Sequence, residues 1–316
     1  ALTRTSIGSV SNVLGGQMAG LTTIQTSGEP GADAAEVFIR GKATWGDASP
    51  LIQVDGVERS MNDIDPNEIE SISILKDASA TAVFGVRGAN GVILITTKRG
   101  REGKAHISFS TSASIQMPTK MVETANSYEY AMFYNQMMAN DTPAGEKPVK
   151  TFSDGVIQKF RDGSDPIRFP SINWIDYIMG DATLQSQHNL NISGGTDKVR
   201  YFISAGAYTQ GGLFNEFSLP YGISYQYRRF NYRSNLDIDV TKTTTISFNV
   251  AGNVNSSEKP RTSQGSSGMV KNIYYSTPFR SAGFVNDKLV YTTTDSQSDG
   301  LNLPFVGDAD PFTYYG

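Results

Sequence analysis

A strict alternation of apolar and polar side chains begins near residue 105. From His106 to Ile115 the odd positions are apolar or neutral, whereas the even positions are His or Ser. The same pattern recurs over residues 229–241 and 243–255, with weaker versions over 184–194 and 199–209. A period of two is that of a β-strand with two different faces. The pattern therefore predicts five strands, with Phe248 and Val250 on an apolar face and Asn249 and Asn253 on a polar one.

The lengths of the connections also alternate. The segments after the first, third and fifth predicted strands are long, whereas short turns follow the second and fourth, at 194–198 and 241–242. Up-and-down membrane barrels have short periplasmic turns and long outer loops. The strands of a β-sandwich also alternate apolar and polar side chains, so a β-sandwich is the alternative fold. The uninterrupted alternation favours strands that cross about 25 Å of lipid at a tilt.

Residues 1–103 follow a different sequence pattern, with short apolar runs separated by turn-forming residues. Four runs are strand-like, at 37–40, 51–54, 72–75 and 92–96. Asp65 precedes Pro66 and lies three residues before Glu68, which predicts a short helix begun by a capping box. A second short helix is expected from Asp77 to Phe84. The predicted fold is an α+β domain over 1–103, followed over 104–316 by the start of an antiparallel transmembrane β-barrel with long loops.

Five strands cannot close a barrel around a domain of this size, so we expect the chain to be the first part of a longer one. Charged residues are 18% of the chain and its net charge is −4, which argues against a nucleic-acid partner. With no Cys and two His, disulfides and thiolate or histidine-rich metal sites are excluded. No apolar stretch is long enough for a transmembrane helix, and Ala1–Arg4 is not a signal peptide.

No residues suggest catalysis, so we expect neither an enzyme nor a bound cofactor or metal. The Gly-x-x-Gly-x-x-Gly segment 85–91 follows a helix and precedes a strand, which is the reverse of a phosphate loop. The carboxylates between Asp55 and Glu68 lack the spacing of a calcium loop. His106 and His188 fall on polar strand positions, without a partner nucleophile.

The loop between the first two of the four predicted strands of the 1–103 domain, Gly41–Ser49, is a candidate binding site. Trp45 offers a flat apolar face for a sugar ring, and Lys42, Thr44 and Asp47 offer hydrogen bonds. The alternative is that Trp45 packs the loop against neighbouring structure. Aromatic side chains in 127–139 and 173–178 have helical spacing and are expected to form the core of the first long loop.

Residues 65–98, DPNEIESISILKDASATAVFGVRGANGVILITTK, resemble the signature region of the SusC/RagA subfamily of TonB-dependent outer-membrane transporters. The segments 15–20, 27–31, 39–41 and 54–57 resemble the same plug-domain pattern in the same order, and 193–201 resembles the early barrel. The signature positions that we single out are Lys76, Asp77, Gly85, Arg87, Gly88 and Gly91.

The resemblance implies a plug inside a barrel of about 22 strands in the outer membrane of a Gram-negative cell, in contact with its lipid. It implies import driven by TonB, through a box upstream of residue 1, and a SusD-like lipoprotein partner, and it allows a dimer of such pairs. It also implies that the loop after Ile39-Arg40-Gly41 faces the substrate cavity. The expected cargo is an oligosaccharide, with oligopeptides as the alternative. A secreted β-rich adhesin or carbohydrate-binding module is the alternative from another class.

Overall fold

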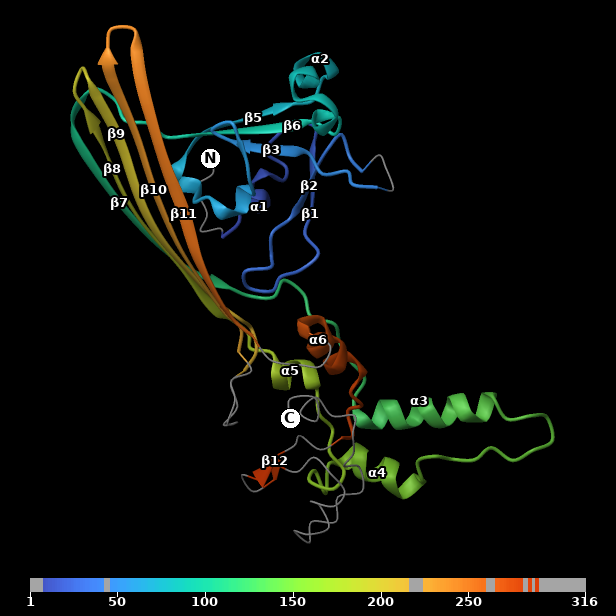
Figure 1. Cartoon of the computed structure of the whole chain (residues 1–316). Helices are drawn as coiled ribbons and strands as arrows, with labels where there is room; N and C mark the ends of the chain where they lie inside the picture. Colours follow the sequence, from blue (N-terminus) through green and yellow to red (C-terminus); the bar gives the residue numbers. More distant parts are fainter. Residues whose placement is uncertain are drawn as a thin grey trace. The chain divides into compact units, whose positions relative to one another are not determined.

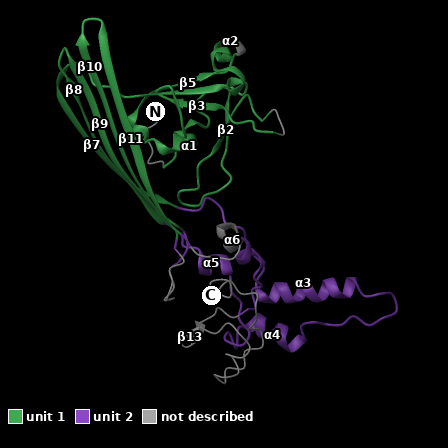
Figure 2. Ribbon diagram, in the orientation of Figure 1, with its two compact units in different colours: residues 1–116, 183–212, 225–258 green, residues 117–182, 213–224, 259–316 purple. Residues whose placement is uncertain are grey.

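A computed structural model describes residues 8–42, 46–215, 224–259, 265–280, 284–285 and 288–289. The chain divides into two compact units (Figure 2). Unit 1 holds residues 1–116, 183–212 and 225–258, and unit 2 holds the intervening segments and residues 259–316. Thr44 and Trp45 of the predicted binding loop lie outside the described residues.

The N-terminal domain of unit 1 contains two small sheets. Strands β1 (Leu21–Ile24) and β2 (Glu36–Ile39) form an antiparallel pair. The second sheet has the order β4-β3-β6-β5, with β3 at Leu51–Val54, β4 at Val57–Glu58, β5 at Ile69–Leu75 and β6 at Val92–Thr97. Buried Val, Leu, Ile and Met side chains from both sheets and from helix α1 (Val10–Leu14) form one core. The four predicted strands are confirmed, whereas β1 and the two-residue β4 were not predicted.

Short helical segments connect these strands: the 3-10 turns η1 (Met61–Asp63) and η2 (Pro66–Glu68), then α2 (Ala78–Thr81) and η3 (Ala82–Gly88). The short helix expected over 77–84 is confirmed in its extent, although its second half is 3-10 and not α-helical. Helix α2 ends at Thr81, and the 3-10 segment that follows kinks at Gly85, whose φ of 60° and ψ of −148° suit glycine alone.

The rest of unit 1 is an antiparallel sheet with the order β11-β10-β9-β8-β7 (Figure 1). Its strands are β7 (Gly103–Gln116), β8 (Thr183–Gly195), β9 (Val199–Gly211), β10 (Gln226–Thr241) and β11 (Thr244–Glu258). All five predicted strands are confirmed, and each extends beyond its predicted range by a few residues. The short connections lie at one end of the sheet, and both long insertions between its strands, 117–182 and 213–224, belong to unit 2.

The two faces of this sheet differ as the alternation predicts. On the outer face Ile107, Phe109 and Phe248 are each more than 60% exposed. On the inner face, Gln185, Asn189 and Asn235 are buried against the N-terminal domain. The prediction that His188 lies on the polar face of its strand is wrong. Its ring shares the outer face with Leu190, and its Nδ1 lies 2.7 Å from the Thr111 hydroxyl.

The apolar band on the outer face runs obliquely to the paired rows of the sheet. On β7 it begins at Ile107, which is connected through Ile192, Ile203 and Ser234 to Val250 on β11. On β11 the band begins earlier, at Ile246. A displacement of four residues is about 13 Å, and it occurs across about 19 Å of sheet, so the strands are tilted by about 35° from the normal to the band. That tilt is typical of membrane barrels.

Unit 2 contains the helices α3 (Ser127–Asn140), α4 (Asp154–Asp162), α5 (Trp174–Ile178) and α6 (Gly265–Tyr275), and the short strands β12 (Phe284–Val285) and β13 (Lys288–Leu289). Ala131, Phe152, Phe160 and Phe279 form its core, with Tyr128, Tyr130 and Tyr134 packed against them. The predicted helices are confirmed, and so is the expectation that these tyrosines pack in the core of the loop. Among the described residues no helix is sufficiently long and apolar to cross a membrane.

Replacing Phe248 by Arg tests the outer face, since a charge at the middle of a lipid-facing strand costs about 2 to 4 kcal/mol. We expect Phe248→Arg to lower the unfolding free energy of the full-length protein in lipid vesicles by this amount. Asn253→Arg, on the inner face of the same strand, should change it much less. Equal losses would contradict the assigned faces.

Candidate functional site: the interface between the N-terminal domain and the strands

Strand β10 presents four buried polar side chains to the N-terminal domain. Because alternate residues of a strand share a face, Arg229, Asn231, Arg233 and Asn235 all project inward. None is more than 6% exposed. Such burial requires partners, because desolvated charges and amides are costly when they are unpaired.

Arg233 is the centre of this interface. Its Nε donates to Glu68 Oε2 at 2.8 Å, and its Nη1 lies 3.5 Å from Asp55 Oδ2. The side chains of Arg233 and Glu68 are only 4% and 2% exposed. Asp55 also accepts hydrogen bonds from the Thr97 amide at 3.0 Å and the Thr97 hydroxyl at 2.6 Å. One guanidinium of the sheet therefore holds two carboxylates of the N-terminal domain.

Local structure positions the two carboxylates. Asp55 lies in the tight turn between β3 and β4, with φ of 49°. Glu68 ends η2, whose start is capped by Asp65 through a bond from the Asn67 amide at 2.8 Å. The predicted cap is thus confirmed. The predicted capping box is wrong, because the Glu68 carboxylate binds Arg233 instead of turning back to its own helix.

Neighbouring contacts extend the interface in both directions. Arg229 and Asn231 donate to the backbone carbonyls of Asn62 and Asp63, each at 2.8 Å. Asn235 donates to the Thr97 hydroxyl at 2.9 Å and the Lys98 carbonyl at 2.8 Å. We call these four side chains of β10 and their partners the latch. The latch ties three segments of the N-terminal domain to one strand.

The latch is only partly satisfied. Burial raises the pKa of Glu68 above its usual value, and the Arg233 guanidinium opposes this shift. Among the described residues, Glu68 Oε1, Asn235 Oδ1 and Arg229 Nη2 are buried without a hydrogen-bond partner. Desolvation of these groups offsets part of what the contacts contribute. The latch therefore fixes the position of the N-terminal domain, but it contributes only modestly to the net free energy of attachment.

The predicted binding loop lies elsewhere. Figure 1 shows the connection between β2 and β3 at the end of the N-terminal domain that is remote from β7–β11. Asp47 Oδ1 accepts from the Ser49 amide at 2.9 Å, which lowers the pKa of that carboxyl. Lys42 Nζ lies 5.9 Å from the centre of the Phe38 ring. These two side chains therefore have local partners.

The signature residues build the turn region around α2 and η3. Asp77 pairs with Arg40 at 2.8 Å, and Arg87 pairs with Glu58. Gly91 has φ of 92° and leaves no room for a side chain beside Ile39. Lys76 lines a small cavity together with Arg40 and Asn90, while Gly88 packs tightly against Thr81 and Phe84. None of the six signature residues contributes to the latch.

Sequence reasoning placed the β10 residues on the polar face but missed their partners. It also missed the basic segment between β6 and β7, although four basic residues within 98–104 were the signal for it. No group of metal-ligating side chains occurs within the described part of the chain.

Breaking the latch on one side should be costly. Removing one partner of a buried ion pair costs about 3 to 5 kcal/mol, so we expect Arg233→Met to destabilise the attachment of the N-terminal domain by about this amount. Denaturant unfolding of the full-length protein measures it. Adding Glu68→Leu should recover part of the loss, because it removes the buried glutamate charge while Asp55 keeps its hydrogen bonds from Thr97.

The exposed pair of Arg87 and Glu58 provides the control. Exposed ion pairs contribute at most about 1 kcal/mol, so Arg87→Gln should have little effect. A loss in Arg87→Gln as large as in Arg233→Met would contradict the central role of the latch.

Comparisons with known proteins fit this arrangement. Residues 1–92 match the family model of the TonB-dependent receptor plug domain. The chain is 32% identical to TonB-dependent receptor P3 of Formosa agariphila over 94% of this chain and 27% of that protein. It is 29% identical to TonB-dependent receptor SusC of Bacteroides thetaiotaomicron over 71% of this chain and 20% of that protein.

The solved structure of the RagAB peptide importer in its open-open state is also similar, with a TM-score of 0.69 and 25% identity. The match covers 92% of this chain and 33% of that chain. The chain thus spans only about a quarter of the curated relatives described above. It comprises the plug domain and the first barrel strands of a TonB-dependent receptor of the SusC/RagA type.

Proposed function

We propose that the complete receptor imports oligosaccharides across the outer membrane of a Gram-negative cell. TonB would supply the energy through a box upstream of residue 1, and a SusD-like lipoprotein would deliver the cargo. In this proposal residues 1–103 are the plug and residues 104–316 are the first barrel strands and their outer loops. The latch is the observation that carries it, because a plug fixed to the barrel wall by few, partly satisfied contacts can be displaced.

The inner face of the sheet supports a neutral cargo. It carries ladders of hydroxyl and carboxamide groups on three strands: Ser108, Ser110, Ser112 and Ser114 on β7, Gln185, Gln187, Asn189 and Asn191 on β8, and Asn249, Asn253 and Asn255 on β11. These ladders contain no ionised group. A polymer that moves past these three strands can exchange many similar hydrogen bonds, and it meets charged side chains on β10, at Arg229, Arg233 and Asp237.

Oligopeptides are the second candidate cargo, favoured by the similarity to the RagAB peptide importer. Growth of a receptor-deletion strain carrying the full-length gene separates the two. We expect restored uptake of neutral oligosaccharides. Uptake confined to peptides would overturn the oligosaccharide assignment. The similarity to TonB-dependent receptors argues against the secreted adhesin.

A reversible cross-link tests whether the plug must separate from the wall. A side-chain carbon placed at Gly206 of β9 would lie 3.6 Å from Asp65 Cγ, close to where the sulfur of a cysteine at position 65 would be, so a small shift allows a disulfide between cysteines at the two positions. We expect the oxidised Asp65→Cys/Gly206→Cys receptor to bind cargo normally at the cell surface but to take up none. Reduction should restore uptake.

The two single cysteine variants control for the loss of Asp65 and the added side chain at position 206. Normal uptake by the fully oxidised double variant would rule out separation at this point of the interface.

We also propose that the Gly41–Ser49 loop contacts cargo through Lys42, Thr44, Trp45 and Asp47. A ring stacked on Trp45 contributes about 1 to 3 kcal/mol, so Trp45→Ala should weaken cargo binding roughly ten- to a hundredfold. Trp45→Phe keeps an aromatic face and should lose less. Calorimetry on the full-length receptor measures both, and unchanged affinity in Trp45→Ala would show that Trp45 packs the loop.

A further inference from the structure

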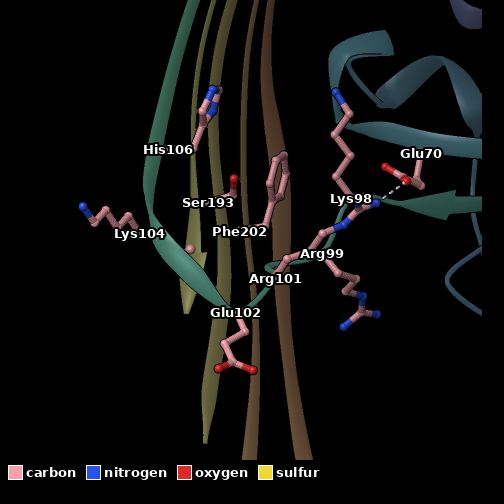
Figure 3. Close-up of a pocket in the computed structure, with 10 residues that line it drawn as sticks. Glu70, Lys98, Arg99, Arg101, Glu102, Lys104, His106, Ser193 and Phe202 are labelled. Atoms are coloured by element: carbon pink, nitrogen blue, oxygen red, sulfur yellow. Dashed lines mark hydrogen bonds and ion pairs between the residues drawn. The ribbon is translucent and has the colours of Figure 1, made fainter. Parts of the chain in front are cut away.

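The segment that joins the plug to the barrel, residues 98–104, borders a cavity of about 340 Å³. The cavity lies between this linker, the start of β5, and strands β7 to β9. Lys98, Arg99, Arg101 and Lys104 supply four cations within seven residues. Figure 3 shows Lys98 along the plug side of the space and His106 along the strand side, with the Phe202 ring between them.

Backbone contacts fix the linker at this place. The Lys98 amide donates to the Glu68 carbonyl at 2.8 Å, and the Lys98 carbonyl accepts from Asn235. Gly100 is buried against the backbone of Tyr201 on β9, where any side chain would overlap that strand. The Lys98 side chain therefore begins from a backbone held on both sides.

The acidic groups around the cavity already have cationic neighbours. Arg99 donates to Asp237 on β10 at 3.2 Å and to Asn249 on β11 at 2.8 Å, so its guanidinium already has partners on the strands. Glu102 also borders the cavity, and its charge is close enough to act on Arg200. Glu70 pairs with Arg101 at 3.2 Å.

The cavity therefore keeps cationic charge that the surrounding carboxylates do not neutralise. Within the described part of the chain, Lys98 has no carboxylate within 4.0 Å. Arg101 is shared with one glutamate in an exposed ion pair, which a stronger anion can displace. The Ser193 hydroxyl adds a further donor from β8. An anion entering here meets donors from the linker and from the wall.

We propose that this cavity is a phosphate-binding site, with Lys98 and Arg101 as its cationic ligands and Ser193 as a hydrogen-bond donor. Donors on separate elements match the four oxygens of a tetrahedral phosphate better than the two oxygens of a flat carboxylate. The phosphate belongs either to free phosphate or to a phospholipid headgroup, since the apolar outer band of β7 begins nearby at Ile107. Its binding would join the linker to the wall.

Two probes test the site on the full-length receptor in neutral detergent. Inorganic phosphate is titrated by calorimetry, and phosphatidylglycerol is compared with phosphatidylcholine by native mass spectrometry. We expect Lys98→Gln and Arg101→Gln to weaken binding of the phosphate probe at least tenfold. Lys242→Gln is the matched control, because Lys242 is exposed in the turn between β10 and β11 and does not line the cavity.

The probes also distinguish the two sources. Retention of phosphatidylglycerol that depends on Lys98 and is displaced by inorganic phosphate assigns a lipid headgroup. Binding of inorganic phosphate alone, with the same dependence on Lys98, assigns the free anion. Binding of neither probe, or equal weakening in Lys98→Gln and Lys242→Gln, would overturn the proposal. Circular dichroism and the unfolding free energy establish that each variant is folded.

Discussion

The contact of Arg233 with Glu68 and Asp55 is the interaction on which the arrangement of this chain depends. It joins the barrel wall to the plug at the point where η2 ends and β3 turns into β4. Arg233 and Glu68 are both buried, so neither can move alone without leaving an unpaired charge. The plug therefore stays attached as a unit, and it can leave only when all the latch contacts separate together.

The same chemistry limits the strength of attachment. The plug core is apolar and closed, with Ile93 and Ile95 almost completely buried. The interface with the wall is polar, and several of its buried atoms have no partner in the described residues. Apolar burial stabilises the plug itself, whereas the latch determines where the plug lies against the wall and adds little net free energy. A load applied to the plug should thus act on the interface before it acts on the core.

Much of the fold could be predicted because it follows from local rules. Alternation placed Phe248 outward and Asn253 inward, and Asp65 before Pro66 predicted the start of η2. The partners of Arg233 could not be predicted, since a period of two assigns a face and not a contact across 165 residues. Glu68 was misassigned for the same reason, because its local capping role competes with a distant guanidinium. His188 shows the opposite failure, since a polar residue at an outward position breaks the pattern that sequence reasoning relied on.

Native-state hydrogen exchange of the full-length receptor tests the central claim most directly. The amides of Glu68 and Lys98 report the segments held by the latch, and those of Ile93 and Ile95 report the plug core. In Arg233→Met we predict faster exchange at Glu68 and Lys98, with unchanged protection at Ile93 and Ile95. Equal loss of protection at all four amides would contradict the account, because the interface and the core would then be one cooperative unit.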